Sequence, residues 1–132
     1  MLENPMAISL DEMIEFRTKI FNRTIETAKK KGADYNRDQQ KSGNSLFNLS
    51  VCELMGIVPT AETGILVRLG DKFMRLISLA RDCRVTPEVT DESVLDTIED
   101  IHNYVDYLAM LYLKRKAVLA EIEAGAPTVH EA

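Results

Sequence analysis

The sequence predicts an all-α protein, with about four main helices in one bundle and a long helix at the C-terminal end. Four segments repeat apolar residues at steps of three and four, as helices do. Polar or glycine-containing stretches separate them, and no segment alternates apolar and polar residues as a half-buried strand would. With 132 residues, 45% hydrophobic and 28% charged, the chain fits a single soluble domain, 1–132. We expect its ends, residues 1–8 and 126–132, to be flexible.

The first helix is predicted to begin at a capping box, where Ser9 accepts a hydrogen bond from the amide of Glu12. Three lysines, residues 29–31, suit the negative end of the helix dipole. Gly32 is expected to take the left-handed turn that ends the helix. The polar stretch 33–44 then forms a long loop, a kind of segment that is often functional or mobile.

Two shorter helices are expected next. The sequence favours Ser45 as the cap of the second helix and Gly56 as its stop. Either Thr60 or Thr63 is expected to cap the third helix, which runs to about Asp82.

The last helix is predicted to begin at a cap formed by Thr90 or Asp91 and to keep its apolar periodicity to about Leu119. Gly125 then ends it. Its C-terminal half, residues 111–122, carries apolar positions that extend beyond the other helices. We expect this half to form a homo-oligomer. The alternative is that it folds back onto the first helix.

Composition excludes several classes of protein. A net charge of −5 argues against a module that binds nucleic-acid duplexes through phosphate contacts. The longest apolar run, residues 104–113, is interrupted by Asp106 and is too short to cross a membrane. Cys52 and Cys83 lack metal-ligand spacing, and the N-terminus lacks the pattern of a signal peptide. These features predict a soluble protein of the reducing cytoplasm.

Charged residues on the last two helices form the candidate site. Six acids and no lysine or arginine lie between Asp91 and Asp106. Like charges one turn apart repel, so a cation is required nearby, either a bound ion or a basic side chain. Carboxylates from facing helices can hold Mg²⁺, and basic residues can neutralise a polyphosphate. The alternative is an ordinary solvated face. The proposed Mg²⁺ ligands are Asp71, Glu92, Asp96 and Asp100, with Glu53 as a further contributor, and the proposed phosphate-binding residues are Arg68, Lys72 and Arg75.

Three stretches resemble a known family: residues 31–35, KGADY; 65–76, ILVRLGDKFMRL; and 91–104, DESVLDTIEDIHNY. Together they are similar to the nucleotide modification associated domain 1 family of phages and bacteria. That family is related to the all-α nucleoside triphosphate pyrophosphatases, the MazG-like and dimeric dUTPase superfamily. The resemblance covers residues 28–113.

The resemblance implies an oligomeric helical enzyme that uses Mg²⁺ and water to cleave a nucleoside triphosphate into a monophosphate and pyrophosphate. It implies a bacterial or phage-infected host cell, catalytic roles for Asp71, Glu92 and Asp96, and base or sugar contacts from Asp34 and Tyr35. The chain departs from the superfamily's paired acids, since Arg68 stands where the third helix would carry the first acid of its pair. Two alternatives therefore stay open: a protein that binds or sequesters a nucleotide without turnover, and a purely structural helical oligomer.

Overall fold

The computed structural model describes residues 4–35, 45–80 and 91–125, and these ranges are all-α, as the sequence predicts. Four helices follow one another: α1 (Leu10–Tyr35), α3 (Phe47–Leu54), α4 (Ala61–Ala80) and α5 (Asp91–Glu123). The last helix is the longest, at 33 residues. Within these ranges no helix is both long and apolar enough to cross a membrane. The expected flexible tail, 126–132, lies outside the described residues.

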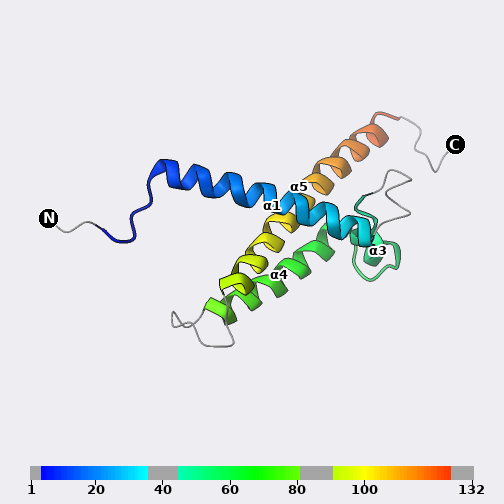
Figure 1. Ribbon diagram of the computed structural model, residues 1–132. Coiled ribbons are helices and arrows are strands. Elements are labelled where there is room, and N and C mark those ends of the chain that lie inside the picture. The colour runs from blue at the N-terminus through cyan, green and yellow to red at the C-terminus, as the bar shows by residue number, and fades with distance from the viewer. Residues whose placement is uncertain (1–3, 36–44, 81–90, 126–132) are drawn as a thin grey trace.

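Helices α4 and α5 form the antiparallel centre of the molecule (Figure 1). Their facing stripes bury Ile65 and Leu69 of α4 against Leu49 of the short helix α3. Two aromatic and four aliphatic side chains complete this core: Tyr104, Tyr107, Leu46, Ile101, Leu108 and Leu111. The core is small, because one short helix and one side of each long helix supply nearly all of it.

An ion-pair cluster fastens α3 and the start of α4 to α5. The guanidinium of Arg115 donates two hydrogen bonds to Glu62, at 2.6 and 3.0 Å, and one to Glu53, at 2.8 Å. The hydrogen bonds that Arg115 donates to Glu62 lower the pKa of Glu62 and raise the pKa of Arg115. Glu53, considered above as a Mg²⁺ ligand, is thus paired with an arginine.

Helix α1 crosses α5, and its N-terminal part extends away from the other helices (Figure 1). Ile20 and Thr24 are buried in the crossing, and Arg23 there reaches Glu99 at 3.1 Å. The other end of α5 projects beyond the start of α4 (Figure 1). Residues 116–123 are all exposed, so the C-terminal end of α5 does not fold back onto α1.

Several predicted helix ends are confirmed. The amide of Glu12 donates to Ser9 Oγ at 3.1 Å, and the amide of Thr63 donates to Thr60 Oγ1 at 3.1 Å. Thr60, of the two candidates, is therefore the cap of α4. Gly56 and Gly125 have φ of +74° and +77°, the left-handed conformation that ends a helix at little cost in glycine. The caps proposed at Thr90 and Asp91 lie outside the residues and side chains described.

Two predicted helix ends are wrong. Helix α1 does not stop at Gly32 but continues to Tyr35, because contacts at the end of α1 offset the roughly 1 kcal/mol that a helical glycine costs. Helix α3 has Leu46 at its N-cap, without a side-chain cap hydrogen bond. Ser45 precedes this position by one residue, and Leu46 packs against the core instead.

Candidate functional site

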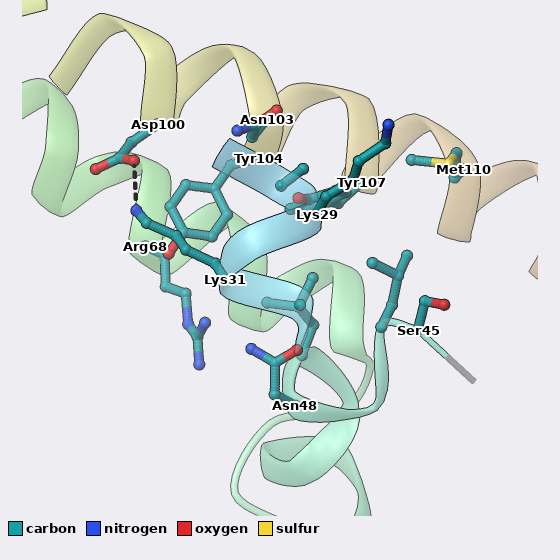
Figure 2. A pocket seen from close by; sticks show the side chains of 14 residues that line it. Lys29, Lys31, Ser45, Asn48, Arg68, Asp100, Asn103, Tyr104, Tyr107 and Met110 are labelled. Carbon is teal, nitrogen blue, oxygen red and sulfur yellow. Dashed lines mark hydrogen bonds and ion pairs between the residues drawn. The ribbon is translucent and has the colours of Figure 1, made fainter. Parts of the chain in front are cut away.

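A pocket of about 390 Å³ lies where the C-terminal end of α1 meets α3, α4 and α5 (Figure 2). Its lining combines basic, amide and aromatic side chains with a few aliphatic ones. The lining residues are Ala28, Lys29, Lys31, Gly32, Ser45, Leu46, Asn48, Leu49, Arg68, Asp100, Asn103, Tyr104, Tyr107 and Met110. They come from chain segments as far apart as residues 28 and 110, so the pocket exists only in the folded protein.

Helical periodicity explains which residues of α5 reach the pocket. Asp100, Tyr104 and Tyr107 follow one another at steps of four and three, which places them on one face of the helix. Figure 2 shows Lys31 extending from α1 to Asp100, with Tyr104 further along α5. Gly32 follows in α1 and also lines the pocket.

A carboxylate between two lysines forms the charged end of the pocket. Lys31 Nζ donates to Asp100 Oδ1, and Lys72 Nζ donates to Asp100 Oδ2, both at 2.9 Å. The side chain of Asp100 is only 18% exposed. Burial acts to raise its pKa, but the hydrogen bonds from Lys31 and Lys72 outweigh burial and lower it. Asp100 is therefore a carboxylate at neutral pH, and the cluster carries a net positive charge.

The remaining lining offers further contacts for a flat, anionic molecule. Arg68 adds a positive charge, and Lys29, which lies 3.5 Å from Glu26, adds a basic group that is already paired. The rings of Tyr104 and Tyr107 meet edge to face, with centroids 6.4 Å apart and planes at 85°. Burial raises the pKa of Tyr107, which keeps its hydroxyl protonated at neutral pH and able to donate a hydrogen bond.

The predicted site residues divide into two groups. Arg68 and Asp100 line the pocket, and Lys72, which is not part of the lining, contacts Asp100. The structure does not bring the others with described side chains into this lining: Asp34, Asp71, Arg75 and Asp96 are exposed and lie outside it. Asp96 lies 4.0 Å from Arg23. The side chains of Tyr35 and Glu92 lie outside the described part of the structure.

Two neighbouring acids of α5 pair closely with basic side chains from other helices. Glu99, with a side chain 6% exposed, pairs with Arg23 of α1 at 3.1 Å, and Asp100 pairs with Lys31 and Lys72. Among the described residues, no three Asp, Glu, His or Cys side chains come close enough to hold a metal ion. The four-acid set remains a prediction, because it includes Glu92.

Sequence reasoning assigned no binding role to four uncharged lining residues: Asn48, Tyr104, Tyr107 and Met110. A signal for part of it was present, since Tyr104 and Tyr107 share a helical face with Asp100. Asn48 had no comparable signal, because it reaches the pocket from a separate short helix.

Comparisons with known proteins add nothing to this geometry: family models, curated proteins and solved structures all gave no match to the chain. Clustered cations attract an anion such as phosphate, while tyrosine rings and amide side chains suit a flat heterocycle.

Proposed function

We propose that the protein is a cytoplasmic nucleotide-binding protein whose ligand occupies the pocket between α1, α3, α4 and α5. The observation that carries the proposal is Arg68, which lines the pocket and is half-buried. It has no ion-pair partner among the residues that the structure describes. A partly buried guanidinium is more stable when it meets an anion, and its planar donors match phosphate oxygens well.

The other lining groups support a nucleotide rather than a bare phosphate. The volume, about 390 Å³, lies within the usual range for small-molecule pockets. Tyr104 and Tyr107 provide apolar ring surface, and Asn48 and Asn103 provide the paired donor and acceptor groups that read base edges. A nucleotide with its phosphates near Lys31 and Arg68 and its base near the tyrosines would contact the basic, aromatic and amide groups of the lining.

Binding without turnover is the form of the proposal that the geometry favours. The resemblance implies Mg²⁺-dependent hydrolysis of a nucleoside triphosphate, with Asp71, Glu92 and Asp96 as the catalytic acids. Asp71 and Asp96 are exposed and outside the pocket lining, and Asp100 is bound to two lysines. Hydrolysis is accordingly the second candidate function, which the same experiment distinguishes from binding.

The test is a thermal-shift screen of nucleoside mono-, di- and triphosphates and cyclic nucleotides, with and without Mg²⁺, followed by chromatography of each stabilising ligand. A ligand at a hundred times its Kd stabilises the folded state by about 2.7 kcal/mol, which is readily measured. We expect R68Q to weaken binding of the best nucleotide by about tenfold or more, because a charge-assisted contact to phosphate is lost.

The matched control is R75Q, which removes an exposed arginine from the same helix but outside the pocket lining. It should bind with nearly unchanged affinity. Equal losses in R68Q and R75Q, or no stabilising nucleotide in the panel, would contradict the proposed site. Recovery of intact ligand supports a binding protein, whereas release of monophosphate and pyrophosphate with Mg²⁺ establishes the hydrolase.

A further inference from the structure

Most of the charge in the pocket lining gathers at one end. Figure 2 shows Asp100, Lys31 and Arg68 on one side of the pocket and the uncharged Ser45 and Met110 on the other. Along α5, the step from Asp100 to Met110 corresponds to about 15 Å of helix. We name the side with Asp100, Lys31 and Arg68 the charged end, and it is the end at which an anionic group of a ligand is stabilised.

The charged end has only a small excess of positive charge. Lys31 and Lys72 share Asp100, because each Nζ lies 2.9 Å from one of its carboxylate oxygens. Two lysines and one carboxylate leave one net positive charge, and Arg68 adds a second. The other basic lining residue, Lys29, is exposed and lies 3.5 Å from a glutamate of its own helix. Among the described residues, the excess at the charged end is therefore two positive charges.

One phosphomonoester group matches this excess. A phosphate attached through a single ester bond carries about −1.5 to −2 charge at pH 7. Each further phosphate of a di- or triphosphate adds negative charge, but the described lining offers no further cation to pair with it. An anion that leaves water for a partly enclosed site is stable there only when its charge is paired. The charged end therefore suits one phosphate group better than two or three.

Asp100 opposes the binding of a longer phosphate chain. Its carboxylate lines the pocket and is held in the ionised form by the hydrogen bonds from Lys31 and Lys72. A second phosphate near Lys31 would approach this fixed negative charge, and like charges repel more strongly away from bulk water. Polyphosphates usually bind together with Mg²⁺, which carboxylates hold. Both oxygens of Asp100 already accept hydrogen bonds from lysines, and the described lining contains no other carboxylate.

We propose that the ligand of this pocket is a nucleoside monophosphate, and that Asp100 selects it against the di- and triphosphates of the same base. The pocket volume, about 390 Å³, agrees with a small ligand, because it lies near the lower end of the range of about 300–1,000 Å³ for small-molecule sites. This inference rests on the proposed nucleotide binding and adds which member of the nucleotide series binds. A monophosphate has no bond between phosphates to cleave, which is consistent with binding without turnover.

The experiment is isothermal titration calorimetry of the full chain in EDTA. The ligands are the nucleosides and the 5′-mono-, di- and triphosphates of adenine, guanine, cytosine, uracil and thymine. For the base that binds best, we expect the Kd of the monophosphate to be at least about tenfold lower than those of the triphosphate and the nucleoside. In D100N, the Kd values of monophosphate and triphosphate should come within about threefold of each other, because the opposing carboxylate is removed. The matched control is D106N, which removes an exposed acid of the same helix outside the lining and should keep the wild-type ratio.

The order of affinities in the wild type tests the inference even if D100N fails to fold. A triphosphate that binds as tightly as the monophosphate, and more weakly to R68Q, would overturn this inference and leave nucleotide binding at the pocket in place. A ratio that D100N leaves unchanged would overturn the selective role of Asp100. A nucleoside that binds as tightly as its monophosphate, or a panel without any binding, would overturn both this inference and the proposed function.

Discussion

Asp100 is partly buried, pairs with two lysines and lines the pocket. We predict that D100N lowers the free energy of unfolding by about 1–2 kcal/mol at pH 7, because two lysines lose a charged partner in a partly buried place. The exposure of Lys31, 52%, keeps the effect below that of a fully buried pair. Urea denaturation of the wild type and the variant measures the difference.

The stability difference between the wild type and D100N should depend on pH. The folded-state pKa of Asp100 is lowered, so its stabilisation is fully present above the unfolded-state pKa, about 4, and is lost as the pH falls through the folded value. The difference between wild type and D100N should therefore shrink steadily below pH 4. D96N is the control, because Asp96 is exposed and 4.0 Å from its arginine. A D96N loss as large as that of D100N would contradict the special role of Asp100.

At the level of single residues, the sequence predicted part of the site. The acidic run of the last helix required a nearby cation, bound or from a side chain, and the structure places Lys31 and Lys72 beside Asp100. Which cation it would be was not predictable from spacing. Lys31 lies 69 positions away in the sequence, and only the crossing of α1 over α5 brings it to the carboxylate.

At the scale of the helices, Arg115 determines how α3 and α4 are joined to α5. We predict that R115Q lowers the free energy of unfolding by about 2 kcal/mol at pH 7, since the carboxylates of Glu53 and Glu62 would then face each other without a cation. The pKa of Glu62, lowered by hydrogen bonds from Arg115, should rise in the variant. NMR titration of the Glu62 carboxyl and chemical denaturation measure the two effects.

The effect of R115Q should also depend on pH. A lowered pKa gives Glu62 a stabilisation that is present above its unfolded value, about 4.3, and is lost as the pH falls through the folded value. Wild type and R115Q should thus converge in acid. K114Q is the control, because Lys114 is exposed and adjacent in sequence. A loss in R115Q that stays constant down to pH 3 would indicate a packing role for the arginine instead.

The helices themselves were largely predictable because their signals are local. Ser9, Thr60 and Gly56 act through neighbouring backbone groups, and the structure confirms each of them. Gly32 and Ser45 did not mark helix ends, because residues distant in the sequence determine where these helices end. Tertiary contacts extend α1 beyond Gly32. Leu46, at the start of α3, packs into a core made by other helices. The pocket depends on the same long-range packing, which explains why its uncharged lining was missed.

The whole molecule has more apolar surface than its fold covers. Leu49, Ile65 and Leu69 form the buried cluster, while large apolar residues are exposed on α1, α4 and α5. Burial of apolar side chains is the main favourable term in folding, so a chain with so small a described core gains much of its stability wherever these surfaces are covered.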